Sequence, residues 1–90
     1  MSRLHLLSRP LPEACAQNCL DACATGDSVL LLGQALLSDA LPLPAGVNVY
    51  ARQEELDAFD PALIKTACEA VTDDVFVALT ETHQSVVSWY

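Results

Sequence analysis

The chain has 90 residues, of which 52% are apolar, and its 12 acidic and 4 basic residues give a formal net charge of −8. One small domain over residues 1–90 is expected at this length, while the scattered basic residues and the negative charge argue against direct binding to nucleic acid or to an anionic membrane. The apolar fraction exceeds the roughly 45–50% of typical soluble domains, which predicts that a partner protein covers part of the surface.

In the first third of the chain, turn residues separate short segments with strand and helix character. Residues 4–7 form an apolar run ended by a turn, so a strand is expected there. Pro12 and Glu13 favour the start of a helix that runs to residue 24, and Gly26 fits as its left-handed cap. The continuous apolar run at residues 28–32 is typical of a parallel strand that helices cover on both faces.

The middle of the chain continues this alternation. A short helix is expected at residues 34–41, a strand at residues 47–51 and another short helix at residues 53–58. Residues 60–72 leave two alternatives open: Asp60 and Pro61 start a helix that continues to residue 71, or residues 67–71 form a strand.

The last third predicts one helix and one strand. Thr72, Asp73 and Asp74 favour the start of a helix over residues 75–82, and residues 86–90 are rich in the β-branched and aromatic residues of strands. The complete order predicts a single-domain α/β fold with a mostly parallel sheet of about five strands and helices on both faces.

The chain carries four cysteines, Cys15, Cys19, Cys23 and Cys68. No signal peptide is recognised and no apolar run reaches the 18 or so residues of a membrane span, so a cytoplasmic location is expected. Thiols stay reduced there, and the four cysteines are therefore expected to be free.

Three of the cysteines recur every four residues, so on a helix they form one stripe with Cys19 at the centre of the apolar face. Burial as small apolar side chains is the default reading for each. Cys15 and Cys23 would lie about 12 Å apart along the helix, too far for one metal ion to bind all three. Neither His5 nor His83 has a cysteine or a second histidine at metal-ligand spacing. The sequence predicts no metal site and no cofactor.

Three passages resemble the TusB/DsrH family, the smallest subunits of a three-subunit sulfur-relay complex. They are residues 4–9, residues 19–32, and residues 73–80 followed by His83 and Trp89. The resemblance implies a DsrE-like, flavodoxin-like sheet and favours a strand over residues 67–71.

The resemblance also implies partners and a function. Two related subunits, TusC-like and TusD-like, would join this chain in a heterohexamer with two copies of each. Such complexes pass persulfide sulfur along cysteines, in one branch to the 2-thiouridine at the wobble position of tRNA and in another branch in sulfur oxidation. The main acceptor cysteine belongs to the TusD-like partner. This chain is therefore expected to be a non-catalytic subunit that meets sulfur carriers only indirectly, with tRNA thiolation favoured as the more general use.

Two alternatives stay open. DsrH-like members carry a cysteine at the position of Cys19, so Cys19 is a candidate persulfide carrier, although its mid-helix, acidic surroundings disfavour a thiolate. A stand-alone homo-oligomeric binding domain is the other alternative. One feature departs from the family. Its members usually carry an acidic residue after the second strand, whereas this chain has Gly33, Gln34 and Ala35 there. Any ligand role that the resemblance implies for this loop is therefore in doubt.

Candidate interface residues lie at the end of the chain. Trp89 and Tyr90 are of the residue types that most often anchor protein interfaces, and His83 is a candidate contact at the rim. The alternative for Trp89, of equal weight, is that it fixes the last strand onto the core of its own chain.

Overall fold

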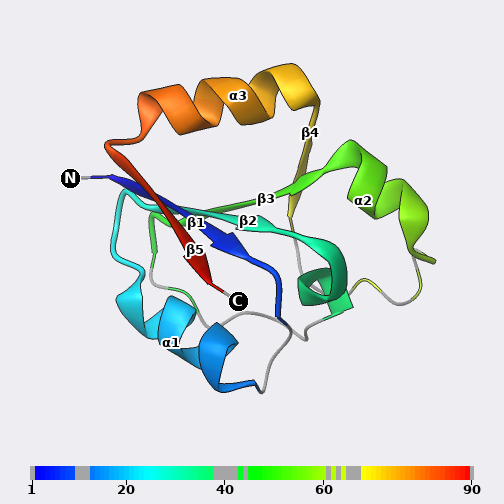
Figure 1. Ribbon diagram of the computed structural model, residues 1–90, viewed down its shortest axis with the longest axis horizontal. Coiled ribbons are helices and arrows are strands. Elements are labelled where there is room, and N and C mark those ends of the chain that lie inside the picture. The colour runs from blue at the N-terminus through cyan, green and yellow to red at the C-terminus, as the bar shows by residue number, and fades with distance from the viewer. Residues whose placement is uncertain are drawn as a thin grey trace.

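The computed structural model describes residues 2–9, 13–37, 43, 45–60, 62, 64 and 68–89. Its strands form one sheet in the order β4-β3-β2-β1-β5, and every neighbouring pair is parallel. The helix α1 covers one face of this sheet and α3 covers the other (Figure 1). The strands are β1 (Arg3–Leu7), β2 (Ser28–Leu31), β3 (Asn48–Arg52), β4 (Glu69–Val71) and β5 (Ser85–Trp89); the helices are α1 (Ala14–Ala22), η1 (Gly33–Leu37), α2 (Gln53–Ala58) and α3 (Asp73–Thr82). The predicted α/β class with a parallel sheet is confirmed.

The core lies on both faces of the central strands. All four residues of β2 are buried, which explains why its sequence is continuously apolar and not alternating. Leu7 and Leu31 pair across β1 and β2 and belong to the core under α1. Leu4 and Leu30 belong to the second core, with Phe76 and Leu79 of α3.

The helix α1 is shorter than predicted. It ends at Ala22, and Cys23 follows as its C-cap in an extended conformation. The backbone N–H of Ala24 donates to Asp27 Oδ2 at 3.1 Å and not to a helix carbonyl, so a side chain ends the helix early. Gly26 has the expected positive φ, 95°, but it lies in the turn to β2 and is not the helix cap.

The two alternatives for residues 60–72 are resolved in favour of the strand. β4 pairs in parallel with β3, placing Glu69 opposite Tyr50 and Val71 opposite Arg52. A helix continuing to residue 71 is therefore wrong, because pairing at the sheet edge outweighs local helix propensity. Pro61 and residues 65–67 lie outside the described residues.

The remaining elements follow the prediction with small shifts. α2 has the predicted bounds, and α3 begins where Thr72 Oγ1 accepts from the Val75 N–H at 3.4 Å. The expected helix at residues 34–41 is a 3-10 helix at Gly33–Leu37, and residues 38–41 lie outside the described part.

Candidate functional site

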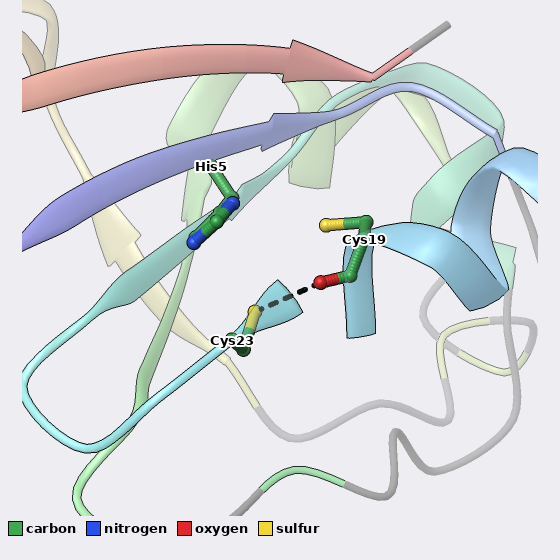
Figure 2. A group of neighbouring side chains, drawn as sticks. All are labelled: His5, Cys19 and Cys23. Carbon is green, nitrogen blue, oxygen red and sulfur yellow. Dashed lines mark hydrogen bonds between the residues drawn. The ribbon is translucent and has the colours of Figure 1, made fainter. Parts of the chain in front are cut away.

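Three side chains with reactive atoms meet between β1 and α1. His5 and Cys19 are completely buried, and Cys23 is half-buried at the end of α1. One ring nitrogen of His5 and the two sulfurs lie within 4.8 Å of one another. Figure 2 shows the imidazole below β1, on the same side of the strand as both thiols. We call His5, Cys19 and Cys23 the thiol–imidazole cluster.

The fold creates this cluster through the alternation of β1. Leu4 points to the α3 face and Leu7 to the α1 face, so His5 shares the α1 face with Leu7. Its partner across the sheet is Val29, which is also buried under α1. Spacing along the sequence cannot reveal this contact, because His5 and Cys19 are separated by a loop and half a helix.

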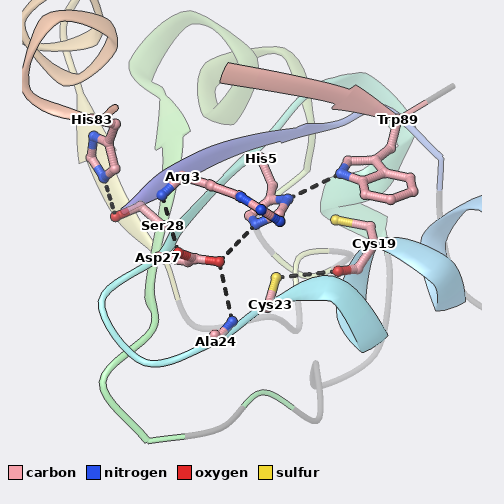
Figure 3. A network of polar contacts seen from close by, with 9 residues as sticks. All are labelled: Arg3, His5, Cys19, Cys23, Ala24, Asp27, Ser28, His83 and Trp89. Atoms are coloured by element: carbon pink, nitrogen blue, oxygen red, sulfur yellow. Dashed lines mark hydrogen bonds and ion pairs between the residues drawn. The ribbon is translucent and has the colours of Figure 1, made fainter. Parts of the chain in front are cut away.

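Hydrogen bonds fix the state of the His5 ring (Figure 3). The indole Nε1–H of Trp89 donates to His5 Nδ1 at 3.1 Å. An indole nitrogen only donates, so Nδ1 must carry a lone pair. The proton of the neutral ring therefore sits on Nε2, which donates to Asp27 Oδ2 at 3.0 Å.

Asp27 is the anchor of this network. Oδ1 accepts from the backbone N–H of Arg3 at 3.0 Å, and Oδ2 accepts from that of Ala24 at 3.1 Å and from His5. Burial raises the pKa of Asp27, but these hydrogen bonds, led by the one from His5, outweigh it and hold that pKa below its usual value. Asp27 therefore stays ionised while joining β1, the turn after α1 and the start of β2.

The two thiols differ in character. Contact with the Cys23 thiol, together with burial, raises the pKa of Cys19 far above its ordinary value. The same contact lowers the pKa of Cys23, whose Sγ donates to the backbone carbonyl of Cys19 at 3.3 Å. Of the pair, Cys23 is the thiol with the more stable anionic form and the greater exposure to solvent.

A cysteine, a histidine and an aspartate in one cluster resemble a nucleophilic triad, but the hydrogen bonds do not form one. In a triad the histidine accepts the proton of the nucleophile through one nitrogen and faces the carboxylate with the other. Here Trp89 occupies the lone pair of His5 that a thiol would need. The network thus holds His5 in place and does not activate a thiol in this arrangement.

Among the residues that the structure describes, every buried side-chain nitrogen and oxygen has a hydrogen-bond partner. The hydrogen bonds of the His5 ring and of the Asp27 carboxylate are therefore complete without a ligand. The two sulfurs and the imidazole of the cluster are nevertheless the donors that soft metal ions prefer. The sequence did not reveal this group, because His5 and the two cysteines come together through the fold and not through their spacing along the chain.

His83 and Trp89 are both engaged within the chain. The His83 ring caps α3, with Nδ1–H donating to the Leu79 carbonyl at 2.7 Å, and its Nε2 accepts from the Ser28 hydroxyl at 2.9 Å. Trp89 is half-buried against the core under α1, which matches the alternative that it fixes the last strand. Their interface roles stay predictions, and Tyr90 lies outside the described residues.

The other candidate residues lie outside the thiol–imidazole cluster. Cys15 and Cys68 are half-buried, and burial raises the pKa of Cys68. The loop after β2 lacks the family's acidic residue, but Glu55 of α2 reaches it and accepts from the Gly33 N–H at 3.3 Å. A surface pocket opens where β4 meets α3, and Arg52 beside it is paired with Asp73 at 2.8 Å.

Comparison with known proteins does not assign the chain to a family. A scan against models of protein families finds no match, and a search of curated proteins finds none either. In the described part of the chain, no helix combines the length and the apolar character that crossing a bilayer requires.

Proposed function

We propose that this chain is a non-catalytic subunit of a cytoplasmic sulfur-relay complex of the TusBCD/DsrEFH type, serving 2-thiolation of the tRNA wobble uridine. The observation that carries the proposal is the state of Cys19, which the resemblance places at the position of the DsrH cysteine. It is completely buried, and Cys23 and burial raise its pKa. A persulfide carrier needs an accessible thiolate, and Cys19 does not provide one.

The outer surface supports a role in assembly. Val75 and Val77 on α3 and Val86 on β5 are exposed apolar side chains. β5 pairs only with β1 among the described strands, and its sequence Ser85–Trp89 has neither a charge nor a proline to protect its free edge. Natural edges are usually protected by such residues, so a TusC-like or TusD-like subunit covering this side accounts for both features.

The test is co-expression with candidate TusC-like and TusD-like subunits, followed by persulfide loading. The complex is incubated with a cysteine desulfurase, its substrate cysteine and the upstream sulfur carrier, and each subunit is weighed by mass spectrometry. We expect stable co-purification and a mass gain of one sulfur on the TusD-like subunit only. A chain that remains alone in solution in the presence of both candidates would contradict the proposal.

The second candidate is a persulfide-carrying subunit of the DsrH type. The observation in its favour is the pairing of Cys19 with Cys23, whose lowered pKa and partial exposure give the pair one route to solvent. In the same experiment it requires a one-sulfur gain on this chain that Cys19→Ser abolishes. A stand-alone homo-oligomeric binding domain would instead form a defined oligomer alone and bind neither subunit.

A further inference from the structure

The donors of the thiol–imidazole cluster converge from two neighbouring parts of the fold. His5 extends from the central strand β1, Cys19 from the last turn of α1, and Cys23 from the C-cap that follows this helix (Figure 2). We propose that this cluster binds one Cu(I) ion through the two sulfurs and one nitrogen of the imidazole ring. The inference is independent of the sulfur-relay proposal.

The spacing of the donors fits a three-coordinate ion. Metal–sulfur bonds of about 2.3 Å place two ligands of a planar, three-coordinate site about 4 Å apart. The three donors now lie within 4.8 Å of one another, so they need to approach by less than about 1 Å. Rotation of the Cys23 side chain, which is only half-buried, supplies this adjustment and also a route for the ion.

The kind of donor selects the ion. Thiolate sulfur and imidazole nitrogen favour soft ions, with Cu(I) and Zn(II) as the common candidates. Structural Zn(II) sites take four protein ligands, and within the described residues only three donors gather at this cluster. Binding of Cu(I) displaces the protons of the two thiols, which pass to solvent. The two resulting thiolates and one neutral imidazole, with no fourth donor among the described residues, suit Cu(I).

Asp27 supplies the carboxylate acceptor that usually binds the second N–H of a metal-binding histidine. A histidine ligand commonly donates its second N–H to a carboxylate, which fixes the tautomer and orients the ring. His5 Nε2–H already donates to the buried Asp27 carboxylate at 3.0 Å. The lone pair is thereby held on Nδ1, which leaves that nitrogen as the ring donor to an ion.

Trp89 competes with the ion for that lone pair. Its indole N–H is bound to His5 Nδ1 at 3.1 Å, and the two cannot share one lone pair. Binding of Cu(I) therefore releases this hydrogen bond, and the only tryptophan of the chain reports the event by fluorescence. Trp89→Phe keeps an aromatic ring but removes the N–H, so it removes the competitor.

The experiment uses a Cys15→Ser/Cys68→Ser background, in which only the clustered thiols remain. Cu(I) is titrated anaerobically against a chromophoric Cu(I) chelator. We expect one equivalent bound, quenched or shifted Trp89 fluorescence, and an X-ray absorption spectrum with two sulfurs and one nitrogen. Adding Cys23→Ser should weaken binding by about 100-fold or more, since loss of even an outer-shell partner costs about 10–100-fold. Adding Trp89→Phe should tighten it by about two- to tenfold.

Three results would overturn the proposal. They are no tight equivalent in the background protein, an unchanged affinity after Trp89→Phe, and a spectrum with sulfur ligands only. Circular dichroism of each variant establishes that it is folded. The absorption spectrum and the Trp89→Phe comparison both leave the cysteines of the cluster intact, so they decide the matter even if Cys23→Ser does not fold.

Discussion

At the scale of single residues, Asp27 is the side chain on which the buried polar network depends. It accepts hydrogen bonds from Arg3, Ala24 and His5. Asp27→Asn replaces one acceptor oxygen by an NH₂ group that faces donors. We expect a loss of about 2–3 kcal/mol in the free energy of unfolding, because buried donors lose their partner. Urea denaturation measures it, with the exposed Asp21→Asn as the matched control, which should change stability by less than about 0.5 kcal/mol.

The lowered pKa of Asp27 also determines how the free energy of unfolding of the metal-free protein should depend on pH. The folded-state pKa of Asp27 lies below the value of about 3.9 expected for the unfolded chain. Its contribution to stability is therefore complete above about pH 4 and is lost as the pH falls through the lower, folded-state pKa. Denaturation at a series of pH values between 2 and 7 should show a smaller loss for Asp27→Asn than for the native chain. Parallel losses in the two proteins would refute this assignment.

The four thiols should react in an order set by burial. Cys19 is completely buried with a raised pKa, whereas Cys15, Cys23 and Cys68 are half-buried. Since the thiolate is the reacting form, Cys19 should be the last to be alkylated in the native protein and should react with the others in urea. Peptide mapping by mass spectrometry after timed alkylation measures the order. If Cys19 in the native protein is labelled as fast as Cys15, Cys19 is not buried in solution.

At the scale of elements, α3 depends on the cap that joins it to the short strand β4. Thr72 Oγ1 accepts from the Val75 N–H, and Thr72 is the residue between Val71 and the helix. Thr72→Ala should cost about 1 kcal/mol of stability. Thr82→Ala at the other end of α3 removes only an exposed hydroxyl that donates to the Leu79 carbonyl at 3.3 Å, and it serves as the control. Equal effects of the two substitutions in thermal unfolding would show that the cap contributes nothing.

The elements that the sequence predicts are those whose signal is local. The apolar run of β2, the bounds of α2 and the Thr72 cap of α3 are each visible within a few residues. β4 is ambiguous in sequence, because its three residues form a strand only by pairing with β3. The end of α1 is set by Asp27, a side chain beyond the helix.

The site was less predictable than the fold. Cys19 is the centre of the apolar face of α1 in sequence and is buried in the structure. Its neighbour His5 lies 14 positions earlier, on a strand, and Trp89 lies 84 positions after His5. Contacts of this kind arise from the sheet order and carry no signal in residue spacing.

At the scale of the whole molecule, the sheet order brings the two ends of the described chain together. β5, the last strand, lies beside β1, with Trp89 opposite Leu7. The Ser8 hydroxyl donates to the Trp89 carbonyl at 3.1 Å, and the Gln84 N–H donates to the Ser2 carbonyl at 3.0 Å. The contacts of Trp89 therefore hold β5 against the core, while Val86 is exposed and no described strand pairs with the outer edge of β5.

Val86, on the exposed side of β5, allows a test that separates an effect on assembly from an effect on stability. Val86 pairs with Leu4 and so projects on the α3 side, with 42% of its surface exposed. Val86→Asp should change the stability of the isolated chain by less than about 1 kcal/mol, because little buried area is lost. In a complex that covers this side, the buried, unpaired carboxylate should abolish co-purification with the TusC-like and TusD-like subunits.

The matched control is Asn18→Asp, which adds the same charge at an exposed position of α1, on the opposite face of the sheet. It should leave both stability and co-purification unchanged. If Val86→Asp is captured as well as Asn18→Asp, the β5 side is not the contact surface. If Val86→Asp instead unfolds the isolated chain, this side chain belongs to the core of the chain itself. Within the described sheet β5 pairs with β1 alone, so the comparison shows whether another chain completes the outer edge of β5.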